Sequence, residues 1–80
     1  MSYQILLVED DLDLRETMLD VLSEQGYQVL AVASGQQAVK EASHRTFDLV
    51  ITDIRMEGMD GLEALERTRK IQPSVSSLVV

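Results

Sequence analysis

The sequence has no cysteine, no tryptophan and a single proline, and aromatic residues make up only 4% of its 80 positions. Without cysteine it can form neither a disulfide nor a thiolate metal site, so nothing in it indicates secretion. It also has no apolar run of membrane-spanning length and no secretory leader. We therefore expect a soluble, cytoplasmic protein without a membrane partner.

Basic residues are scarce as well. Seven lysines and arginines stand against fourteen aspartates and glutamates, which gives a net charge of −7. Nucleic-acid binding needs clustered basic side chains, so we expect this segment to bind no nucleic acid itself. The charge balance leaves open a DNA-binding domain elsewhere in the intact protein.

Apolar residues are present at regular spacing throughout. They occupy 45% of positions and charged residues 26%, which is ordinary for a globular domain. Eighty residues allow one domain, which would bury about 60–65% of its unfolded surface and so have a narrow stability margin.

Short apolar runs alternate with segments of helical periodicity. Asp10 or Asp11 can cap the first helix, Gly26 can end it, Asp60 can cap the third, and Pro73 prevents the third from continuing. The expected strands are residues 3–8, 28–33, 48–52 and 77–80, and the expected helices are about 11–25, 34–44 and 60–71.

Each expected helix has apolar positions that recur on one face. We expect these positions to face inward: Leu14, Met18, Val21 and Leu22 in the first helix, Ala38, Val39 and Ala42 in the second, and Leu62, Leu65 and Ile71 in the third.

Strict alternation of strands and helices predicts an α/β fold with a doubly wound parallel sheet. Right-handed crossovers and a strand order of 2-1-3-4 would place the first helix on one face and the other two on the opposite face. One helix cannot cover four strands, and the fourth strand would be an open edge. We therefore expect residues 1–80 to be an incomplete domain that further elements complete. The same exposed surfaces allow a homodimer.

Acidic residues follow two of the apolar runs. Glu9, Asp10 and Asp11 come after residues 5–8, and Asp53 comes after residues 49–52. The carboxyl ends of these strands should meet where the sheet's winding reverses, the usual ligand site of such folds. Clustered carboxylates repel one another unless a proton or a cation neutralises them, and oxygen ligands without histidine or cysteine favour Mg²⁺ over zinc.

A carboxylate beside Mg²⁺ can attack a phosphoryl group, because the metal offsets the charge of both partners. Spacing alone leaves the alternative open: Asp10 and Asp11 only cap a helix, and Asp53 is an ordinary loop residue.

Three stretches carry a family resemblance: residues 5–11 (ILLVEDD), 48–56 (DLVITDIRM) and 58–61 (GMDG). In order and at this spacing they resemble the receiver domain of bacterial two-component response regulators, which has a flavodoxin-like fold. The resemblance covers all 80 residues but only about the first two-thirds of a receiver domain.

The resemblance implies a role for each acidic residue. Asp53 would be the phosphoacceptor that takes a phosphoryl group from a sensor histidine kinase. Asp10 would bind Mg²⁺ directly, Glu9 would act through metal-bound water, and the backbone carbonyl of Arg55 would be the third protein ligand. Asp11 would be a cap or lie outside the ligand set.

Two departures from the family pattern stand out. Glu57 occupies a position that usually holds proline, which removes a fixed φ and adds negative charge near the site. The family's switch serine or threonine, its phosphate-binding lysine and its output surface have no counterpart in these 80 residues.

The resulting interpretation is a Mg²⁺-dependent phosphoaspartate switch in a phosphorelay. It would govern an output domain in the intact protein. The Asp53–Met56 turn is similar to that of receivers attached to transcriptional activators, so the output domain is expected to act in transcription. It would not be an enzyme beyond its own phosphorylation and dephosphorylation. One alternative is a Mg²⁺-dependent phosphohydrolase with an aspartyl-phosphate intermediate. Such enzymes need a second acid two residues after the nucleophile, and Arg55 occupies that position here. The other alternative is an interaction module that never takes phosphate.

The remaining candidates have simpler interpretations. His44 is expected to be solvated rather than a ligand, and Arg67, Arg69 and Lys70 suit the end of a helix rather than a nucleic-acid site. Met56 and Met59 are expected to be packing residues.

Overall fold

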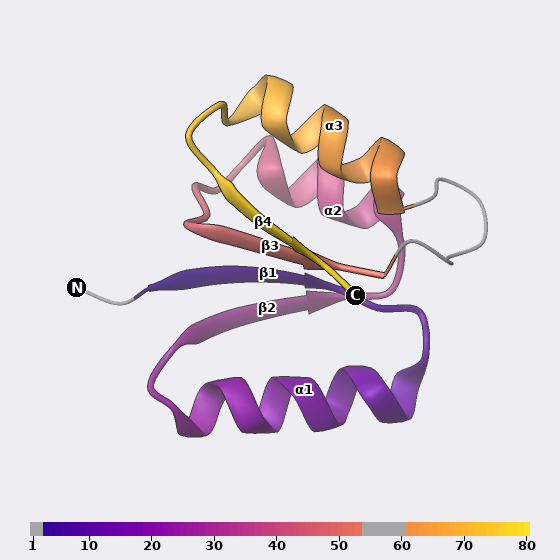
Figure 1. Cartoon of the computed structure of the whole chain (residues 1–80), viewed down its shortest axis with the longest axis vertical. Coiled ribbons are helices and arrows are strands. Elements are labelled where there is room, and N and C mark those ends of the chain that lie inside the picture. Colours follow the sequence, from indigo (N-terminus) through magenta and orange to yellow (C-terminus); the bar gives the residue numbers. More distant parts are fainter. Residues whose placement is uncertain (1–2, 54–60) are drawn as a thin grey trace.

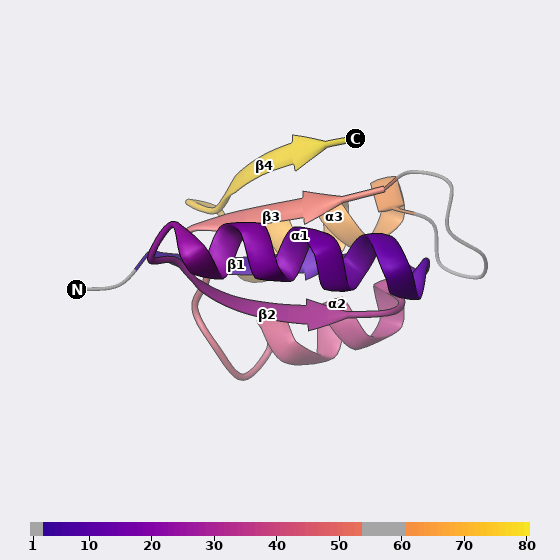
Figure 2. The ribbon, with the colours of Figure 1, turned by 90° about the horizontal axis from the view of Figure 1, so that it is seen from below.

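A computed structural model describes residues 3–53 and 61–80. Four strands form one sheet with helices on both faces (Figures 1 and 2). The elements in chain order are β1 (Gln4–Val8), α1 (Leu12–Glu24), β2 (Gln28–Val32), α2 (Gly35–Ala42), β3 (Leu49–Thr52), α3 (Gly61–Ile71) and β4 (Ser76–Val79).

The strand order is β2-β1-β3-β4 with all neighbours parallel, so the predicted sheet is confirmed. Ile5 of β1 lies opposite Val29 on one side and Leu49 on the other. β1 is therefore an interior strand. Its four apolar residues 5–8 are almost completely buried, as expected for a strand that is covered on both faces.

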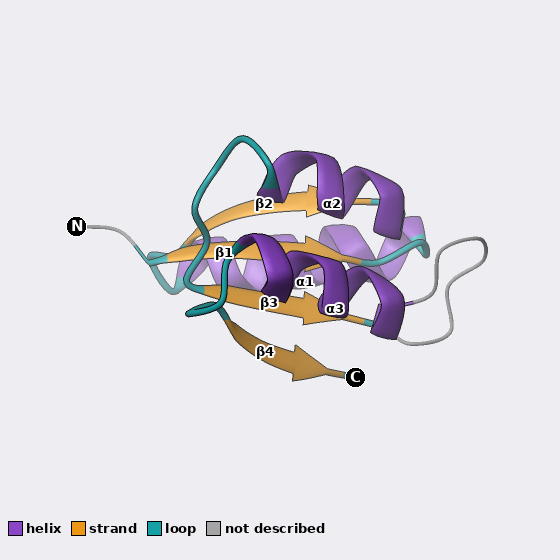
Figure 3. Ribbon diagram, turned by 90° about the horizontal axis from the view of Figure 1, so that it is seen from above, coloured by secondary structure: helices purple, strands orange, loops and turns teal. Residues whose placement is uncertain are grey.

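The helices are distributed as the crossover rule predicts. α1 lies on one face of the sheet, while α2 and α3 lie side by side on the other (Figures 1 and 3). The direction of winding reverses between β1 and β3, so the carboxyl ends of these two strands are neighbours at the reversal point.

The larger apolar core lies between the sheet and the α2–α3 layer. It consists of Leu6, Val8, Val32, Ala38, Phe47, Val50, Leu65 and Val75. A smaller cluster of Ile5, Leu7 and Ile51 lies on the α1 face, with Met18 and Leu22 packed against it. Successive residues of β1 thus contribute to opposite faces of the sheet.

The expected inward face of α3 was partly wrong. Leu65 is buried, but Leu62 is 53% exposed and Ile71 is 43% exposed. α3 instead buries mostly small residues at spacings of three and four: Gly61, Ala64, Leu65 and Thr68. Small side chains let α3 lie close to the sheet and to α2, whose buried residues Gly35, Ala38 and Ala42 are equally small.

The expected stripe on α1 was also partly wrong. Met18 and Leu22 pack on the sheet, but Leu14 is 45% exposed and Val21 is 53% exposed. α1 contacts β1 and β2 and leaves the β3–β4 side of its face open. An apolar groove of about 290 Å³ lies there, lined by Thr17, Met18, Val21, Leu22, Ile51, Leu78 and Val80.

Side-chain caps define the N-termini of α1 and α2. The Asp11 carboxylate accepts a hydrogen bond from the Leu14 amide, and the Ser34 hydroxyl accepts one from the Gln37 amide. Gly26 has a φ of 93° after α1, as predicted. α2 ends at Ala42, two residues before the predicted end.

Within the described residues, no helix has the length and apolar character needed to cross a membrane.

Candidate metal centre

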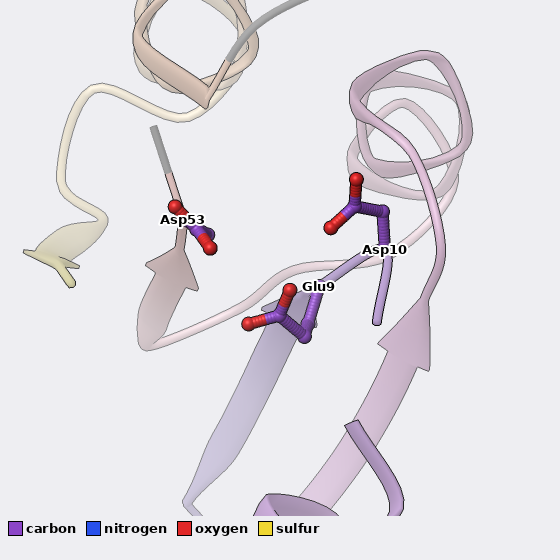
Figure 4. A group of neighbouring side chains, drawn as sticks. All are labelled: Glu9, Asp10 and Asp53. Atoms are coloured by element: carbon purple, nitrogen blue, oxygen red, sulfur yellow. The ribbon is translucent and has the colours of Figure 1, made fainter. Parts of the chain in front are cut away.

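Glu9, Asp10 and Asp53 come together at the carboxyl edge of the sheet, as predicted (Figure 4). Each offers one carboxylate oxygen, and these oxygens lie within 4.8 Å of one another. Backbone hydrogen bonds hold the two strand ends in place. The Glu9 amide donates to the Val32 carbonyl over 3.0 Å, and the Asp53 amide donates to the Val8 carbonyl over 3.3 Å.

Glu9 is the buried member of the group, with only 2% of its surface exposed. Its Oε2 accepts a hydrogen bond from the Asp11 amide over 3.3 Å, whereas its buried Oε1 has no hydrogen-bond partner among the described residues. Burial raises the pKa of Glu9, and the neighbouring Asp53 and Asp10 carboxylates raise it further against the opposing effect of the Asp11 amide. The site therefore favours a proton or a cation at this carboxylate.

Asp11 does not belong to the cluster. Its side chain caps α1 through the Leu14 amide, so the interpretation of Asp11 as a cap is confirmed. The sequence did not reveal the role of Arg15, whose guanidinium group donates a hydrogen bond to the Glu9 carbonyl over 3.0 Å. This contact fixes the turn between β1 and α1 from within the helix.

The donor set fits Mg²⁺. The three side chains supply only carboxylate oxygens, which are hard ligands, and the orphaned Glu9 Oε1 is a buried acceptor that a cation or its bound water would satisfy. The group contains no histidine or cysteine, so it favours Mg²⁺ over zinc. The predicted Arg55 carbonyl ligand, the Glu57 departure, the Asp60 cap, Met56 and Met59 lie outside the described residues.

The basic residues late in α3 lie away from this edge. α3 begins beside Asp53 and runs back toward the opposite edge, so Arg69 and Lys70 in its last turn are far from the carboxylates (Figure 1). Arg67 pairs with Glu63 over 3.3 Å, and Arg69 donates to the Ser77 hydroxyl over 3.2 Å. His44 is exposed just after the end of α2.

Removing the charge of Glu9 should stabilise the metal-free protein. Because its pKa is raised on folding, the ionised form opposes folding, and the penalty appears as the pH rises through the folded-state pKa. We expect Glu9→Gln to raise the free energy of unfolding at pH 7, because the amide has the size of the carboxylate but no charge to desolvate. Urea denaturation in a chelator would measure it.

The gain should vanish at about pH 4 and below, where the wild-type carboxyl is increasingly protonated in both states. Glu16→Gln, an exposed change of the same kind in α1, should leave stability nearly unchanged at both pH values. A Glu9→Gln variant that is less stable than wild type at pH 7 would contradict the account.

The comparisons with known proteins agree with this geometry. The sequence model of the response regulator receiver domain matches residues 5–80. The Bacillus subtilis sporulation initiation phosphotransferase F is 32% identical over 80 residues, which are 100% of this chain and 64% of that protein. The Pseudomonas aeruginosa response regulator protein FleR is 39% identical over 80 residues, which are 100% of this chain and 17% of that protein.

The chain thus spans less than two-thirds of these relatives. Among solved structures, a CheY-like receiver domain protein from Methanospirillum hungatei superposes with a TM-score of 0.95 at 26% identity, covering 99% of this chain and 63% of that one. The Thermotoga maritima response regulator TrrA, solved in complex with Mg²⁺-BeF, gives a TM-score of 0.85 at 34% identity, covering 96% of this chain and 65% of that one. From the match over residues 5–80 and the shared fold, the chain belongs to the response regulator receiver domain family.

Proposed function

We propose that this chain supplies the phosphoacceptor site of a two-component phosphorelay. Asp53 takes a phosphoryl group from a sensor histidine kinase, with Mg²⁺ held by Glu9, Asp10 and Asp53. The observation that carries the proposal is the meeting of these three carboxylates at the strand reversal, where the buried Glu9 Oε1 has no hydrogen-bond partner in the described part of the chain.

Each residue has a distinct part in this proposal. Asp10 is the exposed carboxylate and would hold the cation directly, while the buried Glu9 would act through a metal-bound water. The family resemblance adds the backbone carbonyl of Arg55, outside the described residues, as a third protein ligand. The bound cation offsets the negative charges that would otherwise keep a phosphoryl group away from Asp53.

Phosphoryl transfer then needs only in-line positioning. A carboxylate oxygen of Asp53 forms the new bond to phosphorus as the bond between phosphorus and the donor imidazole nitrogen breaks. The electron pair of the broken bond stays on that nitrogen. The chain acts as an acceptor switch and not as an enzyme with a separate substrate.

The names of similar proteins support the proposed partners. A structure of the histidine kinase ThkA in complex with TrrA superposes on this chain with a TM-score of 0.88 at 34% identity. A relative in Escherichia coli O157:H7 is the transcriptional regulatory protein ZraR, 36% identical over 79 residues. We propose a cytoplasmic protein with a kinase partner and an output domain that controls transcription. A homodimer stays a prediction from the sequence.

A Mg²⁺ titration followed by amide-resolved NMR tests the site directly. In the wild-type chain we expect Mg²⁺-dependent shifts concentrated at residues 9–11 and 53. Asp10→Asn should weaken Mg²⁺ binding by at least roughly tenfold, because a lost contact between a full charge and a cation is worth more than the approximately 1.4 kcal/mol of one decade.

The matched control is Asp13→Asn, which makes the same change at an exposed acid in the first turn of α1. It should leave the Mg²⁺ affinity within about twofold of wild type, because its contribution is a screened long-range charge. Equal weakening by both variants would mean that Mg²⁺ responds to net charge and not to this site.

A further inference from the structure

A glycine at the start of α3 lies against the backbone of the proposed phosphoacceptor. Gly61 is buried and is the first residue of α3. A Cβ atom built on it would collide with the Asp53 carbonyl oxygen. It would also lie 2.8 Å from the Asp53 carbonyl carbon and 2.8 Å from Thr52 Oγ1. Two of these three atoms belong to the backbone, so no side-chain rotation relieves the collision.

Gly61 is needed here for space and not for backbone conformation. The positive-φ glycine among the described residues is Gly26, at 93°, and a Cβ atom there would have nothing within 4 Å. The two glycines therefore separate two effects of a methyl group. At Gly26 it strains the backbone in open space, and at Gly61 it intrudes on the Asp53 peptide.

The residues before Asp53 are held from the other sides. The Asp53 amide donates to the Val8 carbonyl over 3.3 Å, and the Val80 amide donates to the Thr52 carbonyl over 3.0 Å. Thr52 is completely buried, and its hydroxyl lies 3.4 Å from the Asp53 carbonyl oxygen. β1 and β4, on opposite sides of β3, thus hold the Thr52–Asp53 peptide, and Gly61 abuts the Asp53 carbonyl that follows it.

α3 cannot easily retreat from this contact. Ala64, Leu65 and Thr68 are buried beneath it. At its far end, the Gln72 side chain bonds to the Ala42 carbonyl and the Phe47 amide, both over 2.8 Å. An atom added at Gly61 would therefore displace mainly the Asp53 carbonyl, and rotation of the Asp53 backbone would redirect its carboxylate.

We propose that Gly61 is a positioning residue for Asp53: with no side chain there, the first turn of α3 abuts the Asp53 carbonyl, and this contact directs the Asp53 carboxylate toward Glu9 and Asp10. The purpose of that orientation, which is to hold Mg²⁺ beside the phosphoacceptor, rests on the proposed function. The contact itself is independent of any metal.

The test compares Gly61→Ala with Gly26→Ala in the same chain. Both replace glycine by alanine, and Gly26 lies in the turn between α1 and β2, away from the carboxylates (Figure 1). Three quantities are measured for each variant: urea stability, the metal-free amide signals of Glu9, Asp10 and Asp53, and the Mg²⁺ dissociation constant. We expect Gly61→Ala to shift these signals and weaken Mg²⁺ binding by roughly tenfold or more, the scale of losing a group that orients a metal ligand.

Gly26→Ala should lower stability and leave the three amide signals and the Mg²⁺ affinity as in wild type. The proposal is overturned if Gly61→Ala keeps wild-type signals at Asp53, or if Gly26→Ala weakens Mg²⁺ binding as much as Gly61→Ala does. Failure of the wild-type chain to bind Mg²⁺ would instead reject the proposed function, and the metal-free Asp53 signals would still decide the role of Gly61.

A second pair of variants serves if Gly61→Ala does not fold. Thr52→Ala removes the side chain packed against the same contact, whereas Thr52→Val keeps its shape and removes only the hydroxyl. We expect Thr52→Ala to weaken Mg²⁺ binding several-fold, as loss of a supporting group does, and Thr52→Val to preserve it. The opposite order would show that the hydroxyl, and not the fit of α3 against Asp53, sets the carboxylate position.

Discussion

Asp53→Asn is expected to abolish phosphoryl uptake by the full-length protein from a small acyl phosphate in the presence of Mg²⁺. The amide keeps the size and shape of the side chain but replaces an anionic oxygen, the atom that attacks phosphorus, with an uncharged NH2 group. Asp53 stands half-buried at the end of β3, with its carboxylate grouped with Glu9 and Asp10, so the change removes the nucleophile without opening the fold. Incorporation of labelled phosphate, or the added mass of an acid-stable trapped product, would measure the loss.

The control is Asp20→Asn, the same substitution at an exposed position of α1. It should be labelled at the wild-type rate. Full labelling of Asp53→Asn would show that another residue is the acceptor. A wild-type protein that binds Mg²⁺ but never takes up phosphate would favour the interaction-module alternative, and repeated turnover of a small phosphoester would favour the phosphohydrolase.

Gln72→Leu is expected to cause the largest loss of stability among the variants considered. One side-chain amide bonds to three backbone groups, one at the end of α2 and two in the segment between α2 and β3. Its Nε2 donates to the Ala42 and Arg45 carbonyls, and its Oε1 accepts from the Phe47 amide. Ala42 and Phe47 are buried, so leucine would leave two backbone groups without partners in the interior.

We expect a loss of roughly 2–4 kcal/mol in the free energy of unfolding, since each unsatisfied buried group costs about 1–3 kcal/mol. A domain of this size has on the order of 4–12 kcal/mol in total, so the change is large. Urea denaturation of the two proteins at equal Mg²⁺ would measure it.

The matched control is Gln37→Leu. Gln37 is exposed and makes one comparable side-chain hydrogen bond, accepting from the Ala33 amide over 2.9 Å. Water can replace that partner, so the loss should stay below about 1 kcal/mol. Equal effects at both positions would mean that the Gln72 bonds contribute no more to folding than an ordinary surface contact.

Much of the fold follows from local pattern. The continuous apolar run 5–8 and its counterpart 49–52 have the composition of buried parallel strands, and the chirality of crossovers then sets the strand order. The helix faces were less predictable. Leu62 and Ile71 are exposed because α3 packs closely through Gly61, Ala64 and Thr68, and hydrophobicity alone ranks these small residues below leucine.

The candidate site likewise includes residues that the sequence predicts and residues that it does not. Strand-end acids identify Glu9, Asp10 and Asp53 from the sequence, because topology brings those ends together. Arg15 and Gly61 were missed because their roles depend on tertiary contacts that sequence spacing does not encode.

The interior position of β1 has a consequence for the order of synthesis. Ile5 can pair with Leu49, its neighbour in β3, only after β3 has been synthesised, and the two residues are 49 − 5 = 44 positions apart in the chain. At roughly 5–20 residues per second, that interval is about 2–9 s during which β1 of a nascent chain, whose residues 5–8 end almost completely buried, lacks one side of its sheet. Asp53 follows β3 directly, so the acidic edge can form once β3 pairs with β1, whereas the core around β1 still needs Leu65 and Val75.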